Sequence, residues 1–349
     1  MATPLYARHT AGLAATYAEI ENLSLNRPEI LAGTPGSITV RQNGSGATFF
    51  ARQYYDFDGR KRDDYIGGQP GTREGDALLA DWRKRIAEAT DLVRIVRLLA
   101  REGYATLTPK QFAALRPLAG HGLFAAGALL VGTHAFGAIV NRLGIRASSF
   151  ATEDVDIARA SKLALKSRPQ GGLAGLLLES GIEFVEVPPL DPRKPSTKFK
   201  ERGRSKFSLD VLAPAKGDEV SAVYVPELET HATALPYLRY LVSESQEGVV
   251  MSSHGAAAVR LPLPERFALH KLIVSRLRKG RPEKSLKDLR QAAILIAALG
   301  ELHPGALVEA FGKTALSTRK HIRVSLDSIR AALEAHPQSW EEIRRAVKG

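Results

Sequence analysis

The stretch Leu129-Leu-Val-Gly-Thr-His-Ala-Phe136, followed further along the chain by Phe150-Ala-Thr-Glu-Asp-Val-Asp-Ile-Ala158, decides how this sequence folds. An apolar run that stops at a Gly-Thr pair predicts a buried strand, a turn and a departing helix. Because glycine has no Cβ, backbone N–H groups at the start of that helix can face a phosphate directly. We therefore expect Gly132 and Thr133 to bind a phosphate group.

Two carboxylates stand two residues apart in Asp154-Val-Asp-Ile157. On a strand, Asp154 and Asp156 would share one face, while the residues beside them point into the opposite, apolar layer. The later segment Phe207-Ser-Leu-Asp-Val-Leu212 has the same strand character with one carboxylate, Asp210. The sequence thus predicts three aspartates at one edge of a sheet.

Carboxylates arranged in this way suit Mg²⁺, which prefers hard oxygen ligands and leaves several positions for water and substrate phosphates. Three of them can hold two ions, one activating an attacking hydroxyl and one neutralising a triphosphate and its leaving pyrophosphate. Mn²⁺ has similar ligand preferences and can substitute. We expect Asp210 to serve the first ion and to act as a candidate general base. An isolated Asp-x-Asp pair is common on solvated surfaces, so the prediction depends on the order of the surrounding elements.

These residues resemble the signature of the DNA polymerase beta-like nucleotidyltransferase superfamily. That signature begins with an apolar residue followed by Gly and then by Gly or Ser. An Asp-x-Asp or Asp-x-Glu pair comes next, and a third acidic residue follows on a later strand. The signature falls on Gly132 and Thr133, on Asp154 and Asp156, and on Asp210. Thr133 departs from the usual Gly or Ser but keeps a hydroxyl, and the interval before the Asp pair is longer than in minimal members. The resemblance implies transfer of a nucleoside monophosphate from a nucleoside triphosphate, with that triphosphate as substrate.

The segments Pro264-Glu-Arg-Phe-Ala-Leu-His-Lys-Leu-Ile-Val274 and Leu286-Lys-Asp-Leu-Arg-Gln-Ala292 are similar to the helical half of a bacterial branch of stand-alone nucleotidyltransferases. This likeness covers residues 107–299. We expect Lys271 to extend its ammonium group toward the triphosphate and Lys287 to lie at the start of the next helix, also as a nucleotide-binding residue. The alternative is that both lysines are surface residues. Toxin nucleotidyltransferases that modify transfer RNA share this general plan.

The pattern of the whole chain is α+β: a nucleotidyltransferase-type mixed sheet with flanking helices, preceded by a small β-hairpin and helical module and followed by a helical domain. The expected domains are residues 1–105, 106–262 and 263–349. In the first, we predict a helix at 10–23, a hairpin with basic and aromatic side chains at 37–65, and a connecting helix at 76–102. The hairpin format suits RNA, although aromatic residues also simply stiffen small sheets.

The catalytic domain is predicted to begin with a helix near residue 107 and to contain strands near 127–131, 154–157, 182–187 and 207–212, with a crossover helix at 173–180. The C-terminal domain is predicted to contain helices at 265–277, 285–299, 304–311, 317–335 and 340–347, because each segment has a 3.6-residue apolar period.

Two basic segments are candidates for binding a nucleic-acid acceptor or the triphosphate. Residues 191–206 contain seven Lys or Arg against two acids, with Pro and Ser throughout, and we expect this loop not to pack. Residues 276–290 have a similar excess. The alternative for both is a plain solvated loop. His134, His254 and His270 lack metal-ligand spacing, so we expect structural roles for them.

The 349 residues allow two or three domains, since domains usually contain about 100–200 residues. The 49 Lys and Arg exceed the 37 Asp and Glu, and this net charge of +12 favours a polyanionic partner. The chain contains no cysteine, which excludes disulfides, thiolate metal sites and cysteine nucleophiles. No stretch approaches the ~18 apolar residues of a membrane span. We expect a cytoplasmic protein without a membrane partner.

Three functions remain open from the sequence. The leading hypothesis is a magnesium-dependent nucleotidyltransferase whose acceptor is RNA, with transfer RNA as one candidate, a protein or a small molecule. The second is a catalytically degenerate nucleic-acid-binding module, although such a module has no reason to keep three carboxylates at matching strand positions. The third is a metal-dependent nuclease, which would not need the Gly132-Thr133 turn.

Overall fold

A seven-stranded mixed sheet forms the centre of the computed structural model, which describes residues 3–26, 29–189, 191–278 and 280–348. Its strands are β5 (Ala128–Val131), β7 (Asp154–Arg159), β8 (Phe184–Glu186), β9 (Lys198–Glu201), β10 (Ser208–Pro214), β11 (Ser221–Val225) and β12 (Thr230–Leu235). The main path runs β11-β12-β10-β7-β5, with β9 on β10 and β8 on β9. The predicted α+β class with a mixed sheet is confirmed.

Strand β7 lies between the other two strands that form the site. It pairs in parallel with β10 and antiparallel with β5, and β10 pairs antiparallel with β9. On both β7 and β10 the residues that alternate with the aspartates are buried: Val155, Ile157, Leu209 and Val211. This period-two burial fixes the register, because a slip by one residue would turn the apolar side chains to the wrong face.

Helices flank this sheet: α3 (Pro109–Gly120), α4 (Gly132–Arg142), α5 (Gly172–Leu178) and α6 (Leu238–Val242). Helix α3 begins with a capping box in which Thr108 and Gln111 satisfy each other's backbone N–H groups. Helix α4 follows β5 without any intervening residue, so the strand-turn-helix predicted at residues 129–136 is present.

A two-stranded antiparallel ribbon, β13 (Ser245–Ser252) and β14 (Gly255–Pro262), was not predicted from the sequence. Most of its residues are buried. Helices α1 and α2 of the N-terminal module cover the ribbon, and β5 and α4 pack against it as well. Such uniform burial removes the polar alternation by which an exposed strand is recognised.

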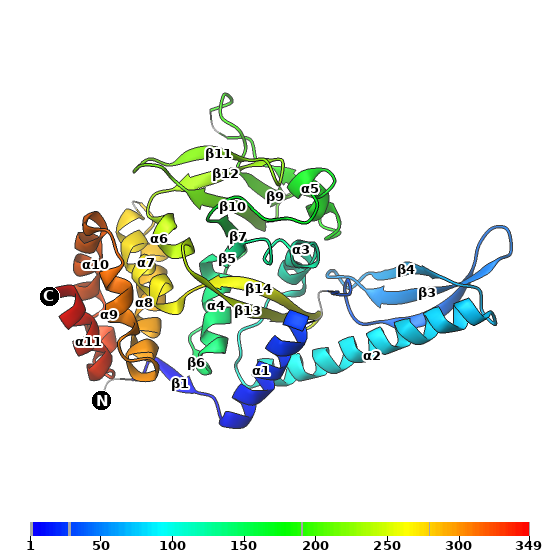
Figure 1. Ribbon diagram of the computed structural model, residues 1–349, viewed down its shortest axis with the longest axis horizontal. Helices are drawn as coiled ribbons and strands as arrows, with labels where there is room; N and C mark the ends of the chain where they lie inside the picture. Colours follow the sequence, from blue (N-terminus) through cyan, green and yellow to red (C-terminus); the bar gives the residue numbers. More distant parts are fainter. Residues whose placement is uncertain (1–2, 27–28, 190, 279, 349) are drawn as a thin grey trace.

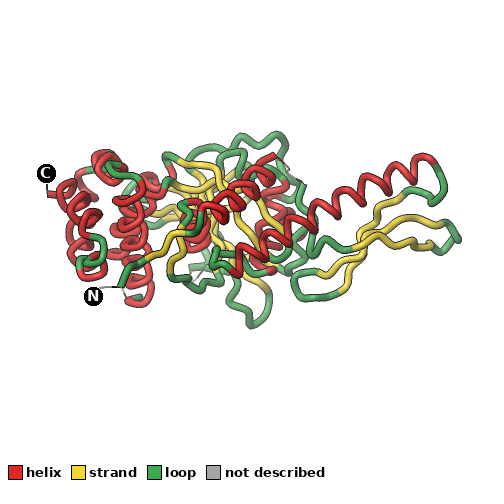
Figure 2. Tube along the Cα trace, turned by 90° about the horizontal axis from the view of Figure 1, so that it is seen from below, coloured by secondary structure: helices red, strands yellow, loops and turns green. Residues whose placement is uncertain are grey.

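The N-terminal module consists of β1 (Tyr6–Arg8), α1 (Ala11–Asn26), β2 (Ser37–Gln42), β3 (Thr48–Tyr55), β4 (Lys61–Gly67) and α2 (Arg73–Arg101). Strands β2, β3 and β4 form the predicted small sheet, and with the far end of α2 they project from the body as an arm (Figures 1 and 2). Helix α2 begins three residues earlier than predicted, because the Thr72 side chain caps it by accepting from the Gly75 N–H.

The other end of α2 and helix α1 pack onto β13 and β14 through a small apolar cluster that includes Tyr17, Leu99 and Met251. Strand β1 pairs with β6 (Ile145–Ala147) and reaches the C-terminal helices (Figure 1). There the Tyr6 hydroxyl donates to Glu301 at 2.5 Å, and the His336 imidazole lies 2.6 Å from the same carboxylate.

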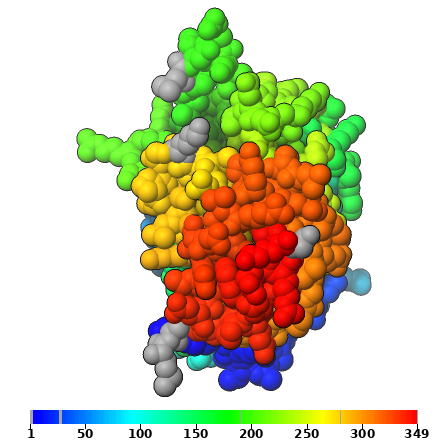
Figure 3. Space-filling view, turned by 90° about the vertical axis from the view of Figure 1, so that its left-hand side faces the viewer, coloured from blue at the N-terminus to red at the C-terminus, as the bar shows by residue number. Residues whose placement is uncertain are grey.

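The C-terminal part is helical, as predicted: α7 (Pro264–Leu277), α8 (Pro282–Leu302), α9 (Ala306–Gly312), α10 (Leu316–Ser328) and α11 (Pro337–Lys348). These helices form one end of the molecule (Figure 3). The single helix predicted at 317–335 is wrong. Helix α10 ends at Ser328, and a short 3₁₀ turn, Ala331–Leu333, brings Leu333 into the core.

Within the described residues, no single helix combines the length and apolar character needed to cross a membrane. Helices α8 and α9 meet both criteria only when taken together, and they are bent by 120° at their junction.

Candidate active site

The three predicted aspartates share one face of the central sheet. Asp210 on β10 lies directly opposite Asp156 on β7, and Ser208 lies opposite Asp154. Residues that face each other across paired strands point to the same side, and neighbouring strands are only about 4.8 Å apart. The register therefore brings together the three carboxylates that the sequence singled out, which we call the aspartate trio.

The Gly132 turn meets this trio from the neighbouring strand. Val131, the last residue of β5, pairs with Asp156, so helix α4 begins beside that carboxylate. Gly132 has a φ of +70°, in the left-handed region that favours glycine. Thr133 follows it in the first turn of α4. The predicted phosphate-binding turn thus lies directly against Asp156.

Crowding of the carboxylates changes their acidity. Burial, followed by the negative charges of Asp210 and Asp154, raises the pKa of Asp156 to about 6. Burial also raises the pKa of Asp210, although the adjacent Lys198 opposes that rise. A divalent cation would be stabilised beside Asp156 and Asp210, whose pKa values are raised, and carboxylate oxygens are the ligands that Mg²⁺ prefers. The donor set therefore fits magnesium.

Within the part of the chain that the structure describes, no three Asp, Glu or His side chains have the arrangement of a formed metal site, although the aspartate trio shares one face. A cation from the protein itself lies among the aspartates instead. Lys198 Nζ is 3.0 Å from Asp210 Oδ2 and 3.7 Å from Asp154 Oδ1. Burial would lower the pKa of Lys198, but Asp210 and Asp154 outweigh it and raise that pKa.

Sequence reasoning missed the role of Lys198 because it assigned residues 191–206 to a loop that does not pack. That expectation is wrong for the second half of the segment. Residues Lys198–Glu201 form strand β9, and Phe199 between its two lysines is buried at 3% exposure. The alternation Lys-Phe-Lys-Glu was the available signal, because it is the pattern of a half-buried strand.

Hydroxyl groups position Asp154. The Ser208 hydroxyl donates to Asp154 Oδ1 at 2.7 Å, and the Asp154 backbone N–H donates to Thr152 Oγ1 at 3.4 Å. The Gln111 side chain in turn donates to the Thr152 carbonyl at 2.8 Å. Ser208 also escaped the sequence analysis, although it stands two residues before Asp210, as Asp154 stands two before Asp156.

Lys271 lies deeper than either sequence-based interpretation assumed. It is 6% exposed, and its ammonium group donates to Asp288 Oδ1 at 2.6 Å. Arg278 donates to the other oxygen of Asp288 at 2.9 Å. Burial would raise the pKa of Asp288, but Lys271 and Arg278 outweigh it and lower that pKa. The surface alternative for Lys271 is therefore wrong.

Both lysines of the helical half still act on the trio by their charge. The positive charge of Lys271 lowers the pKa of Asp156, against the larger effect of burial. Burial, and then the nearby Lys271, lower the pKa of Lys287, whereas Asp156 raises it. Lys284, in the same basic segment, lowers the pKa of Asp210. Helices α7 and α8 thus present positive charge toward the aspartates.

The three histidines carry no charge near neutral pH, although His134 lies close to Asp154 and Lys287. Burial, followed by the charge of Lys287, lowers the pKa of His134 to about 4, and burial lowers the pKa of His270 to about 3. Burial likewise lowers the pKa of His254. All three are neutral imidazoles near pH 7.

A cavity of about 590 Å³ adjoins the start of α4. It is bounded by Thr133 and His134 on α4, by the segment from Ser148 to Thr152 that leads into β7, and by residues 103–108 at the end of the N-terminal module. The rings of Phe136 and Phe150 form an edge-to-face pair in its wall, with centroids 5.4 Å apart. The cavity therefore joins apolar surface to the hydroxyls next to the trio.

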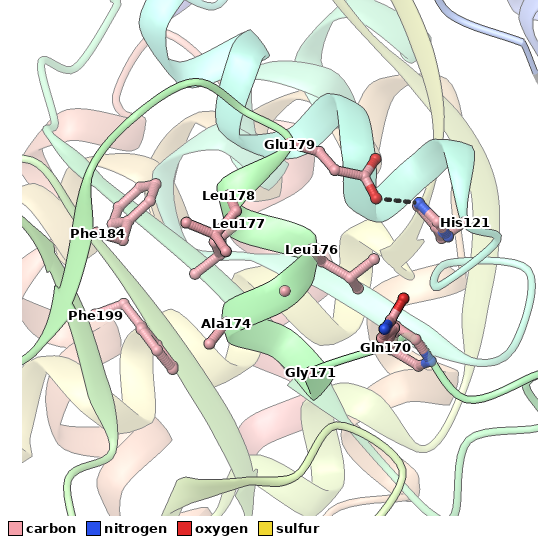
Figure 4. Close-up of a pocket in the computed structure, with 12 residues that line it drawn as sticks. His121, Gln170, Gly171, Ala174, Leu176, Leu177, Leu178, Glu179, Phe184 and Phe199 are labelled. Carbon is pink, nitrogen blue, oxygen red and sulfur yellow. Dashed lines mark hydrogen bonds and ion pairs between the residues drawn. The ribbon is translucent and has the colours of Figure 1, made fainter.

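A second cavity, of about 670 Å³, lies on the opposite face of the sheet (Figure 4). Phe199 lines it, and Phe199 points away from the face that carries Lys198. Its other walls are the side chains of α5 and Phe184, with the His121 and Glu179 pair at one edge. None of the predicted site residues faces this cavity.

The comparisons with known proteins gave one match. A family model described as nucleotidyltransferase matches residues 110–316, which is more than half of the chain and includes every predicted site residue. The comparisons with curated proteins and with solved structures found no match.

Proposed function

The chain belongs to this nucleotidyltransferase family, and we propose that it transfers a nucleoside monophosphate from a nucleoside triphosphate to an acceptor hydroxyl in a magnesium-dependent reaction. One observation carries the proposal: Asp154, Asp156 and Asp210 share one sheet face in register, with the Gly132 turn against Asp156. A nuclease would need the carboxylates but not the phosphate-binding turn.

The aspartate trio would hold the magnesium, and bound there the metal would lower the pKa of the acceptor hydroxyl and neutralise charge on the triphosphate. Gly132 and the first N–H groups of α4 bind the triphosphate, with Thr133 adding a hydroxyl donor. Asp210 accepts the proton of the acceptor hydroxyl. The acceptor oxygen forms a bond to the α-phosphorus, and the bond to the leaving pyrophosphate breaks.

Positive charge for the pyrophosphate comes from the helical half. Lys284 lies in the first turn of α8 and Lys287 in the second, and both act electrostatically on the trio. Lys271 is held by Asp288, so it supports the site through its field and by fixing α7 against α8. We therefore assign direct triphosphate contact to Lys287 before Lys271.

RNA is the acceptor that we propose, with transfer RNA as one candidate. The net charge is +12, and each basic segment reaches the trio: Lys198 of residues 191–206 pairs with Asp210, and Lys284 of residues 276–290 acts on the same carboxylate by its charge. In Figure 3 green surface protrudes at the top and at the left of the molecule, and yellow surface lies next to it. A polyanion at the trio would meet both basic segments.

The arm offers a second contact surface for that RNA. Phe49 and Tyr65 form a ring pair with centroids 5.0 Å apart on the face of the β2-β3-β4 sheet that α2 leaves uncovered. Tyr65 is 73% exposed, and Arg41 and Lys61 share the same face. Exposed rings flanked by cations bind unpaired bases by stacking.

A transfer assay tests the proposal. The protein is incubated with Mg²⁺ and each of the four nucleoside triphosphates labelled at the α-phosphate, with total RNA and cell lysate as acceptors. We expect label to enter an acceptor with the wild-type protein and not with Asp210→Asn. Polynucleotide cleavage without any added triphosphate would instead identify a nuclease. Salt-sensitive RNA binding without transfer, unchanged in Asp210→Asn, would identify a binding module.

A further inference from the structure

We propose that Lys198 is the resident cation of the metal-free site: its ammonium group occupies the place between Asp154 and Asp210 that a divalent ion takes, and it moves to the triphosphate when the ion binds. This inference rests on the proposed function, because it requires the aspartate trio to be the metal site. Lys198 lies outside the nucleotidyltransferase signature, and its ammonium group would bind the carboxylates in one state and the triphosphate in the other.

The position of Lys198 is built into the sheet. Lys198 lies directly opposite Asp210 in the antiparallel pairing of β9 and β10, so the two side chains share a face. Phe199 anchors the strand through the opposite face. At the far end of β9, Glu201 binds Lys110 of α3 at 2.9 Å. The strand that carries Lys198 is therefore fixed by pairing with β10 and β8 and by the salt bridge at its far end.

The Lys198 ammonium group occupies the position that a cation shared by Asp154 and Asp210 would occupy. Its Nζ lies 3.0 Å from Asp210 Oδ2 and 3.7 Å from Asp154 Oδ1, which is the position of a bridging cation. Magnesium binds carboxylate oxygens at about 2.1 Å, so an ion shared by the same two side chains would stand within van der Waals contact of that nitrogen. Two positive charges at such a separation repel strongly in a partly buried site. Metal entry must displace the ammonium group.

The displaced side chain has a productive destination. A lysine carries its charge on a flexible four-carbon stem, so Nζ can turn several ångströms while β9 stays paired. A bound triphosphate brings new negative charge to the same edge of the sheet, next to Gly132 and the start of α8. Lys198 would then join Lys284 and Lys287 around the phosphates. The same residue would oppose binding of the metal alone and favour binding of the metal with its nucleotide.

Lys198 is therefore expected to weaken binding of the metal alone and to strengthen binding of the nucleotide, and both affinities can be measured with the full chain. Wild type, Lys198→Met and Lys200→Met are stripped of metal and titrated with Mn²⁺ at about pH 8, above the Asp156 pKa of about 6, and free Mn²⁺ is followed by electron paramagnetic resonance. Lys200 is the matched control, because it stands on the same strand and the same face, opposite Ser208. We expect Lys198→Met to bind Mn²⁺ about tenfold more tightly than wild type, and Lys200→Met to stay within about twofold.

The second measurement uses a nucleoside triphosphate analogue that cannot be cleaved, titrated at saturating Mn²⁺. Here we expect Lys198→Met to bind about tenfold more weakly than wild type. Lys198→Gln provides a second neutral variant, and the melting temperature in chelator, which we expect to fall in both and to recover with Mn²⁺, shows that each is folded. Lys198→Arg keeps the charge, so it should bind Mn²⁺ more weakly than either neutral variant.

Equal Mn²⁺ affinities for Lys198→Met and Lys200→Met would overturn the role of Lys198 while leaving the metal site intact. Weaker Mn²⁺ binding by the neutral variants would overturn it as well. A failure of the proposed function has a different signature: no Mn²⁺ binding by wild type or by either neutral variant, or binding that Asp156→Asn leaves unchanged, would show that the trio is not a metal site.

Discussion

The carboxylate of Asp156 lies against the Cα atom of Gly132, so closely that a Cβ on Gly132 would overlap Asp156 Oδ2 and stand 3.1 Å from its Cγ. This contact joins the two halves of the predicted signature, the phosphate-binding turn and the acidic strand. Two observations explain why residue 132 is glycine. The backbone there has a φ of +70°, and the space that a side chain would need is filled by Asp156.

Gly132→Ala should therefore disrupt the site beyond its effect on the backbone. A non-glycine residue at positive φ costs about 1–2 kcal/mol in the free energy of unfolding. Gly144 provides a matched control, since its φ is +66° and no atom lies within 4 Å of a Cβ built there. We expect Gly144→Ala to lose about that amount and to retain Mn²⁺ binding, whereas Gly132→Ala loses more stability and its Mn²⁺ binding. Equal metal affinities in the two variants would contradict this.

Ionisation of Asp156 should destabilise the metal-free protein. Its pKa is about 6 in the folded state and about 3.8 in the unfolded chain, so the folded state retains the proton to higher pH. The contribution of this group to stability therefore falls as the pH rises from about 4 to about 6 and is constant above. Asp156→Asn cannot ionise. We expect it to be more stable than wild type above pH 6, by about 1–2 kcal/mol after allowance for solvent screening, with the difference vanishing near pH 4.

Denaturant unfolding in chelator across this pH range measures that difference. A gap between the two proteins that stays constant from pH 4 to pH 7 would contradict the assignment of the shift to Asp156. Saturating Mg²⁺ should reverse the order, because the metal stabilises the ionised wild-type carboxylate and has one ligand fewer in the variant.

Removing one partner of the buried pair of Lys271 and Asp288 should cost more stability than breaking a surface pair. Lys271→Met leaves Asp288 buried with Arg278 as its remaining partner, and breaking a buried ion pair in this way typically costs about 3–5 kcal/mol, here toward the low end. The double variant Lys271→Met with Asp288→Leu removes the stranded charge and should recover part of the loss. Chemical denaturation of both proteins checks this, and a double variant less stable than Lys271→Met would contradict it.

The arm should contribute to RNA affinity through Tyr65. Stacking of a base on an aromatic side chain is worth about 1–3 kcal/mol, so Tyr65→Ala should weaken RNA binding by about tenfold. Tyr224 on β11 serves as the control, because it is 49% exposed and lies away from the arm. Fluorescence anisotropy with labelled total transfer RNA measures both. Identical losses for the two tyrosines would remove the arm from the proposed interface.

Much of the fold was predictable because its local patterns agree with its packing. The period-two burial around Asp156 and Asp210, the Gly-Thr turn after β5 and the apolar periods of α7, α8 and α11 all appear in the structure near their predicted positions. In each case the residue types on the buried face were the signal.

The sequence did not show what depends on pairing between distant segments. Strand β9 was hidden because charge and proline dominate residues 191–206, although Phe199 is its buried anchor. The ribbon of β13 and β14 was hidden because both of its faces are covered. The placement of Lys198 among the aspartates follows from the register of β9 on β10, and no local pattern in the sequence encodes that register.

The roles of the trio themselves stay predictions, and one measurement tests them most directly. Wild type, Asp156→Asn and the exposed-loop control Asp191→Asn are compared for transfer of label from an α-labelled nucleoside triphosphate to RNA, with and without Mg²⁺. We predict transfer by wild type and Asp191→Asn only when Mg²⁺ is present, and none by Asp156→Asn. Equal labelling by Asp156→Asn and wild type would contradict the assignment of this sheet edge as the catalytic centre.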